Sequence, residues 1–216
     1  MTKRVPPDVL CDPDLGCGWT DYCSHQALAQ YGFRPRVAGL ANTQSAAVVI
    51  ADVSGKGVAA GLLMPSIEVA LRMNAPRFPS TSDLLQLFNN VVCQVTSGLR
   101  FISLFYGKLY PQSGSLEYTN AGHNPPLLIR AGMDPSPLDK GGPVLGVLPD
   151  SKYESEKISL RQGDVLVLYT DGAVEAENPA GEQYSAERLS ETVRLHLQQN
   201  ASELIETIYG SVTQFR

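Results

Sequence analysis

Hydrophobic and polar positions along this chain first predict a strand and then a helix, with a polar turn between them. The apolar run Ala46–Ala51 predicts a buried strand, and the glycine-rich stretch Asp52–Gly57 predicts the turn that follows it. Apolar residues then recur at helical spacing over Val58–Met73. Asn74-Ala-Pro76 ends this helix, because proline cannot continue it.

The middle of the chain changes from helical to strand-like spacing. A second amphipathic helix is predicted to about Val95, and either Ser82 or Asp83 can cap its first turn with a side-chain oxygen. Two strands, Phe101–Tyr110 and Ser115–Ala121, then predict a hairpin around a Pro-Gln-Ser-Gly turn. Because the first of these strands is apolar on both faces, it should be central in its sheet.

The remaining pattern predicts more strands and two closing helices. A Pro/Gly-rich loop around Gly141-Gly-Pro143 separates the first of these strands from the others. The predicted strands are Pro126–Ala131, Tyr153–Leu160 and Val165–Thr170, and the predicted helices are Ser185–Gln198 and Ala201–Gln214. Helices, then antiparallel strands, then helices are typical of a layered α+β fold, since each sheet face must be covered.

Length and composition indicate one folded domain. The chain has 216 residues, of which 43% are hydrophobic and 18% charged, enough for one sizeable core. Residues 1–34 are rich in Pro, Cys and Gly and show no clear pattern, so we expect an irregular segment there, with one short helix around Ser24–Gln30. The domain itself is expected over residues 35–216.

Charge and hydropathy exclude two classes of partner. A net charge of −5 and a pI near 5.2 argue against nucleic-acid binding, which needs clustered Lys and Arg. No apolar stretch approaches the roughly 18 residues of a membrane span, and the N-terminus lacks the apolar segment of a secretion signal. We therefore expect a cytoplasmic protein with no membrane partner.

The cysteines do not match a structural zinc site. Cys11, Cys17, Cys23 and His25 follow the spacing C-x5-C-x5-C-x-H, whereas such sites usually open with two cysteines in one tight turn. Reduced thiols are the simpler interpretation, because disulfides are rare in reducing compartments. Cys93 is then a core residue of the second predicted helix.

Two carboxylates follow the ends of predicted strands. Asp52 follows one strand, and Asp171 follows Val165–Thr170 and precedes Gly172. Neighbouring strands would bring these carboxylates together, and hard cations such as Mg²⁺ or Mn²⁺ prefer oxygen ligands. Each residue also has a structural interpretation, with Asp52 as a helix cap and Asp171-Gly172 as an ordinary turn.

Four ordered motifs carry a resemblance to a known family. They are Asp52-Val-Ser-Gly-Lys-Gly57, Phe105-Tyr-Gly107, Asn120-Ala-Gly-His-Asn-Pro125 and Tyr169-Thr-Asp-Gly172. Together they resemble the SpoIIE/RsbU branch of the PP2C-like (PPM) serine/threonine phosphatases over roughly residues 45–214. The resemblance implies an α-β-β-α sandwich of two mainly antiparallel sheets flanked by helices, with a binuclear Mn²⁺ or Mg²⁺ centre. It also implies hydrolysis of phosphoserine or phosphothreonine on a regulatory protein, often an anti-sigma-factor antagonist of the STAS type.

The resemblance assigns metal-binding and catalytic roles to particular residues. Asp52 would bridge the metals, Val53 would offer its backbone carbonyl, and Asp171 would hold one metal. Asp21, in Gly18-Trp-Thr-Asp-Tyr22, echoes the first motif of the family and is carried as a further ligand. Glu175 or water could complete the set.

The resemblance also implies residues that bind the substrate. Gly55 and Gly57 allow a tight turn before a helix whose N-terminal N–H groups favour anions. Lys56 is either a phosphate contact or a solvated charge. His123 is either a proton donor or, with Asn124, part of a stabilised turn.

The chain also departs from the family pattern, and this leaves a second hypothesis. Relatives carry a further acidic motif after the last helix, on a closing strand, and no Asp follows Asp171 here. A sheet edge without that strand could pair with another chain, so we also consider a homodimer. The alternative to an enzyme is a catalytically impaired module that binds a regulatory partner.

Two other enzyme classes fail on their motifs. A P-loop would need Gly in place of Ile50 and Ser or Thr in place of Gly57. A serine hydrolase would need a glycine two residues before Ser54, where Asp52 stands.

Overall fold

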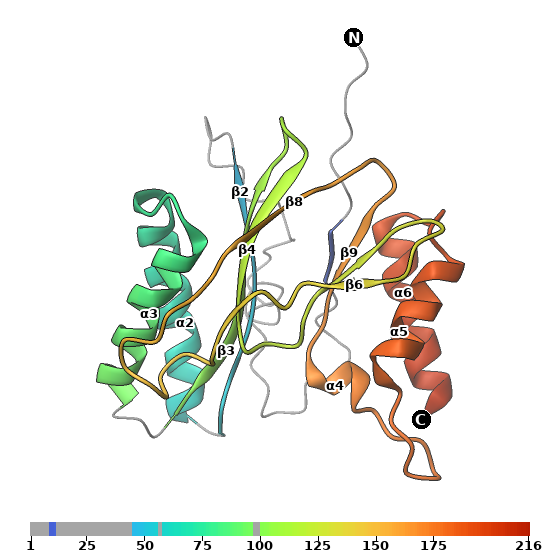
Figure 1. Ribbon diagram of the computed structural model, residues 1–216. Coiled ribbons are helices and arrows are strands. Elements are labelled where there is room, and N and C mark those ends of the chain that lie inside the picture. Colours follow the sequence, from blue (N-terminus) through green and yellow to red (C-terminus); the bar gives the residue numbers. More distant parts are fainter. Residues whose placement is uncertain (1–8, 12–44, 56–57, 97–99) are drawn as a thin grey trace. The chain divides into compact units, whose positions relative to one another are not determined.

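The computed structural model describes residues 9–11, 45–55, 58–96 and 100–216, which fall into two compact units (Figure 1). Unit 1 contains the described part of Met1–Gly18 together with Pro126–Leu138 and Leu160–Arg216. Unit 2 contains the described part of Trp19–Pro125 together with Asp139–Ser159. Each unit has its own sheet and its own helices, so we describe the two units separately.

Unit 2 is built on a sheet in which β3 is central. The strand order is β2-β3-β4-β7, and β8 also pairs with β4. All of these pairs are antiparallel except β4 with β7. The strands are β2 (Ala46–Val53), β3 (Ile102–Tyr110), β4 (Ser115–Ala121), β7 (Gly141–Gly142) and β8 (Glu156–Ser159).

Two helices cover one face of this sheet, as Figure 1 shows. They are α2 (Val58–Asn74), which is followed by the 3-10 turn η1 (Ala75–Arg77), and α3 (Thr81–Thr96). Side chains of α2 and α3 share a core with alternate residues of the strands, including Val53, Leu104 and Tyr106. Because strand side chains alternate between faces, Asp52 and Ser103 belong to the opposite face of the sheet.

Helix α3 begins at Thr81, before either of the predicted cap residues. Ser80 caps the helix, since its Oγ accepts a hydrogen bond from the Ser82 N–H at 3.2 Å and its carbonyl accepts one from Leu84. The prediction that Ser82 or Asp83 is the cap is therefore wrong. The start of the helix is also tied to the sheet, because the Thr81 N–H donates to Glu117 Oε1 on β4 at 3.0 Å.

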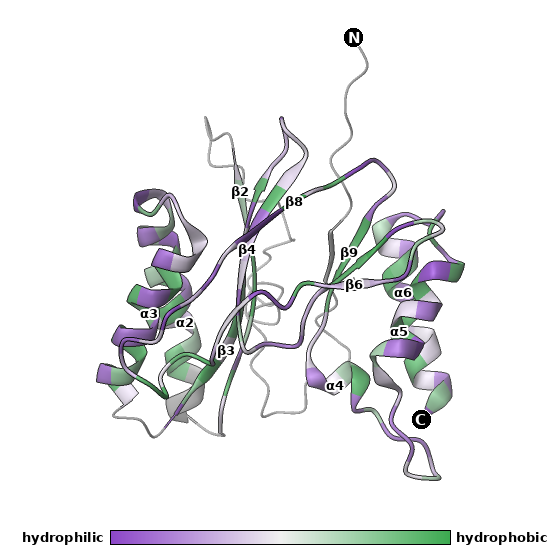
Figure 2. Cartoon of the chain, in the orientation of Figure 1, coloured by the Kyte–Doolittle hydropathy of each residue, from purple (hydrophilic) through white to green (hydrophobic). Residues whose placement is uncertain are grey.

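Unit 1 has a smaller sheet, in which β9 lies between β1 and β5. The strand order is β1-β9-β5-β6; β1 is parallel to β9, and the other pairs are antiparallel. Its strands are β1 (Val9–Cys11), β5 (Leu127–Ile129), β6 (Ser136–Pro137) and β9 (Val165–Leu168). All four residues of β9 are buried, and Figure 2 shows this strand as continuously hydrophobic.

Unit 1 also contains three helices. They are α4 (Asp171–Val174), α5 (Ser185–Leu195) and α6 (Ala201–Phe215). Leu189 and Val193 of α5 share a core with Leu204 and Ile208 of α6 and with the strand residues Ile129 and Val167. This packing explains the helical spacing of apolar residues after residue 185.

The sequence-based predictions hold for the main elements. The hairpin, the central place of β3 and the two closing helices are confirmed. Over the described residues, no helix has the length and apolarity that crossing a membrane requires. The fold class is α+β, with two mainly antiparallel sheets and flanking helices.

Other details differ from the predictions. Gly141–Gly142, predicted as loop, forms the two-residue strand β7. Cys93 lies on α3 as predicted but is only half-buried. Residues 9–11 form β1 inside a segment predicted to be irregular, while the predicted helix around Ser24–Gln30 lies outside the described residues.

Candidate active site

Asp52 lies within strand β2 rather than in the turn after it. The strand continues to Val53, because its antiparallel pairing with β3 extends through Asp52 opposite Ser103 and Val53 opposite Ile102. The Asp52 side chain is half-buried, and Val53 is buried against the helices. The prediction of a turn starting at Asp52 is therefore wrong by two residues, and a regular sheet fixes the position of this carboxylate.

The turn itself begins at Ser54, and hydrogen bonds with the two residues that precede β3 hold it in place. The Ser54 N–H donates to the Phe101 carbonyl at 2.9 Å, and the Phe101 N–H donates to Ser54 Oγ at 2.8 Å. Arg100 Nη1 donates to the Ser54 carbonyl at 3.0 Å. Gly55 has φ +91°, a conformation that favours glycine, and a Cβ there would come 2.4 Å from Arg100 Nη1. Lys56 and Gly57 lie outside the described residues.

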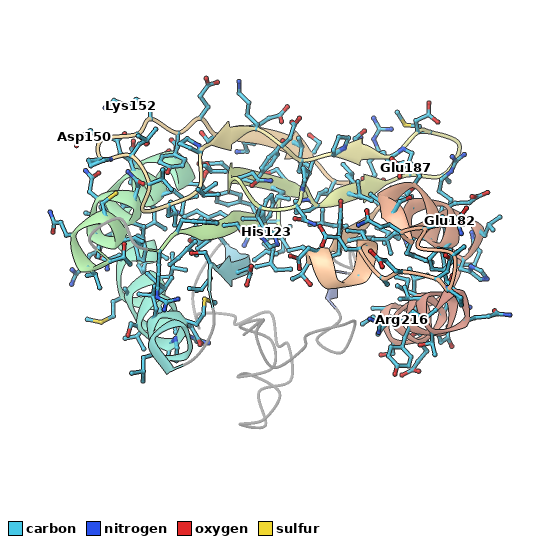
Figure 3. All side chains as sticks on the ribbon, turned by 90° about the horizontal axis from the view of Figure 1, so that it is seen from below. His123, Asp150, Lys152, Glu182, Glu187 and Arg216 are labelled. Carbon is cyan, nitrogen blue, oxygen red and sulfur yellow. The ribbon has the colours of Figure 1, made fainter. Side chains whose placement is uncertain are left out.

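His123 lies just after β4 in a loop that the Asn120 side chain closes (Figure 3). Asn120 Oδ1 accepts a hydrogen bond from the His123 N–H at 2.8 Å, and Asn120 Nδ2 donates to the His123 carbonyl at 3.0 Å. The imidazole is buried, and its Nδ1 lies 2.9 Å from Ser103 Oγ. Ser103 is the residue opposite Asp52, so the structure brings His123 and Asp52 to the two sides of Ser103. Asn124 is half-buried beside them in the sequence.

Two glycines, one in this loop and one in the neighbouring strand β7, allow the backbone around His123 to pack closely. Gly122 has φ +67°, and a Cβ there would come 2.5 Å from Val144 Cγ1. A Cβ on Gly141 would come 1.8 Å from the Asn120 carbonyl oxygen. These contacts explain why glycine is needed at both positions, and they fix the backbone that carries His123.

Asp171 begins the short helix α4 in unit 1. Its Oδ1 accepts a hydrogen bond from the Gly172 N–H at 2.7 Å, and its carbonyl accepts one from Glu175 at 2.8 Å. The Asp171 side chain is half-buried, whereas Glu175 is exposed. The Asp-Gly pair is therefore the first turn of a helix rather than an isolated turn.

The donor groups of these residues suit a hard divalent cation. Two half-buried carboxylates, Asp52 and Asp171, and the backbone carbonyl of Val53 are the oxygen ligands that Mg²⁺ and Mn²⁺ prefer. Asp21 lies outside the described residues, as do Cys17, Cys23 and His25. Within the part of the chain that the structure describes, no group of three or more His, Cys, Asp or Glu side chains is arranged to hold a metal.

Three residues near Asp52 were not singled out from the sequence. No distinctive motif marks Ser103, Arg100 or Phe101 in the sequence. They lie near Asp52 and Ser54 only because β2 pairs with β3. The predicted hairpin placed Phe101 at the start of a strand, but nothing in the sequence indicated which strand lies beside it.

The fold and these motif residues together define a PP2C-type domain. The chain belongs to the SpoIIE family, because residues 42–216 match the family model described as "Stage II sporulation protein E (SpoIIE)". It is 30% identical over 176 residues to "Phosphoserine phosphatase RsbU" of Bacillus subtilis (strain 168) and 26% identical over 200 residues to "Protein IcfG" of Synechocystis sp. (strain ATCC 27184 / PCC 6803 / Kazusa). These matches cover 80% and 77% of this chain. The chain spans only 52% and 32% of the lengths of these relatives.

Solved structures share the fold. The RsbU and RsbW domains of Rv1364c from Mycobacterium tuberculosis match with a TM-score of 0.67 and 23% identity, covering 96% of this chain and 54% of that one. The SiaA-PP2C domain of Pseudomonas aeruginosa matches with a TM-score of 0.66 and 16% identity, covering 80% of this chain and 74% of that one. RsbX, solved in complex with magnesium, matches with a TM-score of 0.56 and 18% identity, covering 81% of this chain and 76% of that one. The predicted fold class is thereby confirmed.

Proposed function

We propose that this chain is a metal-dependent protein phosphatase that hydrolyses phosphoserine or phosphothreonine on a regulatory protein. The observation that carries the proposal is membership of the SpoIIE family together with 30% identity to a phosphoserine phosphatase. The resemblance found in the sequence suggests a STAS-type anti-sigma-factor antagonist as the substrate. We further propose that the phosphatase domain extends over residues 35–216, that the protein is cytoplasmic, and that a second copy of the chain is a further partner.

Asp52, Asp171 and the Val53 carbonyl are the proposed metal ligands, and Asp21 is proposed as an additional one. The oxygen chemistry of these groups and the magnesium complex of RsbX support Mg²⁺ or Mn²⁺ as the ion. When bound, such a centre would lower the pKa of a water molecule and stabilise the charge of the phosphoryl group. The pairing of β2 with β3 keeps the Asp52 carboxylate in place.

The substrate would be bound by residues that follow Asp52 and β4. Gly55, Lys56 and Gly57 precede helix α2, whose N-terminal N–H groups favour an anion such as phosphate. His123 and Asn124 are the proposed contacts on the other side of Ser103. Ser103 Oγ lies 2.9 Å from His123 Nδ1 and fixes the orientation of the ring, whose proposed role is to donate a proton to the leaving oxygen.

The test is phosphate release from a phosphoserine protein in the presence of Mn²⁺, Mg²⁺ or a chelator. We expect release with metal, none with chelator, and a loss of at least about a hundredfold in Asp52→Asn, because one metal ligand would be weakened. Asp134→Asn is the matched control, since Asp134 is an exposed carboxylate. A folded wild-type chain that binds the phosphoprotein without releasing phosphate would instead indicate a catalytically impaired binding module.

A further inference from the structure

Residues 144–146 lie beside the start of strand β3, on the side away from β2. The Ile102 N–H donates to the Leu145 carbonyl at 2.9 Å, and the Leu145 N–H donates to the Ile102 carbonyl at 2.8 Å. On its other side, Ile102 lies opposite Val53 of β2. Because adjacent strands lie about 5 Å apart, Leu145 is only about 10 Å from Val53, a proposed metal ligand in the same unit.

The loop that follows, residues 147–151, is held against helix α3 by side-chain hydrogen bonds. Asn90 Oδ1 accepts from the Asp150 N–H at 2.9 Å, and Asn90 Nδ2 donates to Asp150 Oδ1 at 3.1 Å. Asn89 Nδ2 donates to the Leu148 carbonyl at 2.8 Å. These bonds hold Asp150 at φ +58°, a conformation uncommon for residues other than glycine. The loop is therefore ordered before any partner binds, which lowers the entropic cost of binding.

This ordered loop presents apolar side chains to solvent. Val147 is 49% exposed and Leu148 is 58% exposed. A Cβ on Gly146 would come 3.0 Å from the Arg100 carbonyl oxygen, so the loop begins next to the residues that precede β3. Single exposed apolar residues need no explanation, but two adjacent ones on an ordered loop beside a candidate active site indicate a contact with a partner.

We propose that Val147 and Leu148 form a docking contact for an apolar patch on the protein substrate. The inference rests on the proposed function, because it takes the phosphorylated protein as the partner. A protein whose phosphoryl group reaches Asp52 must approach the end of the sheet where β2 ends and β3 begins. Figure 1 shows the segment that leads to β8 passing this end of unit 2. A folded protein can span the distance from Asp52 to the loop, whereas a small phosphate ester cannot, so the loop would favour protein substrates.

The test compares kcat/KM for two substrates in the presence of Mn²⁺. One is a STAS-domain protein phosphorylated on serine, and the other is para-nitrophenyl phosphate. The double variant Val147→Ser, Leu148→Ser should lower kcat/KM for the phosphoprotein about tenfold relative to that for the small ester, chiefly by raising KM, because the apolar contact is lost.

Two further variants show whether the effect belongs to this apolar contact. The double variant Val147→Ile, Leu148→Met keeps the loop apolar and should keep the wild-type ratio of the two kcat/KM values. Met73→Ser is the matched control, because Met73 is 61% exposed at the end of α2 that lies farther along the chain from Asp52. It should also keep the wild-type ratio. Urea unfolding confirms that each variant is folded.

The proposal is overturned if the double serine variant keeps the wild-type ratio, or if kcat/KM falls equally for both substrates, since the loop would then have only a structural role. Turnover of the small ester without turnover of the phosphoprotein would also overturn it, although metal-dependent hydrolysis would stand. If the folded wild type turns over neither substrate, the proposed hydrolysis fails. Calorimetric binding of the phosphoprotein then decides: about tenfold weaker binding by the double serine variant supports the docking contact, and equal binding or none contradicts it.

Discussion

Asn89 is a buried amide that fixes the loop after β7 to helix α3. It has no exposed surface; its Nδ2 donates to the Leu148 carbonyl at 2.8 Å, and its Oδ1 accepts from the Gly146 N–H at 3.0 Å. Asn89→Ala would leave both backbone groups without this partner, so we expect the free energy of unfolding to fall by about 3 kcal/mol. Urea denaturation measures this change. Gln94→Ala, at an exposed position of the same helix, should change it by less than about 0.5 kcal/mol, and equal effects would contradict the assignment.

The Tyr106 hydroxyl should make the free energy of unfolding fall at alkaline pH. Burial raises the pKa of its hydroxyl to about 12, above the ordinary value of 10.0, so the folded state holds the proton more tightly than the unfolded state. This contribution is fully present below pH 10 and is lost as pH rises towards 12. Between about pH 9 and pH 12, the wild type should therefore lose about 2 kcal/mol more stability than Tyr106→Phe. Identical pH profiles from urea unfolding would show that the hydroxyl does not titrate differently on folding.

The site residues differ in how far the sequence could predict them. Asp52, Asp171, Gly55 and His123 stand in short motifs that can be read locally. Arg100 could not be predicted, because its contact with Ser54 joins residues 46 positions apart and depends on strand pairing. A local motif can identify a candidate site residue. The residues that contact it in the folded protein can be identified only from the tertiary structure.

Among the helices and strands, hydrophobic spacing predicts those that are long and bury one regular face. Helices α2, α3, α5 and α6 and the β3–β4 hairpin each bury a regular set of apolar residues, which the spacing reveals. The two-residue strands β6 and β7 have no such pattern. Strand β7 exists because Gly141 allows close approach to the Asn120 backbone, a contact that no local rule predicts.

Helix α6 begins with a capping box that can be tested by itself. The Glu203 N–H donates to Asn200 Oδ1 at 3.1 Å, and the Asn200 N–H donates to Glu203 Oε2 at 3.1 Å. Asn200→Ala should lower the free energy of unfolding by about 1 kcal/mol, because an N–H at the helix start loses its acceptor. Chemical denaturation measures the loss, and exposed Gln198→Ala is the control. A loss no larger than that of the control would mean that solvent replaces the cap without cost.

At the scale of the whole molecule, the order of the motifs predicted the family and the fold class. The α+β architecture with two sheets follows from helices that must each cover a sheet face. The proposed metal ligands could not be predicted in the same way. Asp52 belongs to unit 2 and Asp171 to unit 1, and the strands that precede them, β2 and β9, belong to different sheets, so strand spacing could not predict the two carboxylates as one set, and only the family resemblance proposes it.

We expect this chain to be an active phosphatase whose turnover depends on Asp171. The most direct measurement is manganese-dependent phosphate release from a phosphoserine protein, comparing the wild type with Asp171→Asn and with the exposed control Asp150→Asn. We predict release by the wild type and the control, and a loss of at least about a hundredfold in Asp171→Asn, whose neutral amide is a poorer metal ligand. Equal release by all three proteins, or no release by the folded wild type, would contradict the proposed phosphatase activity and the role of Asp171 in it.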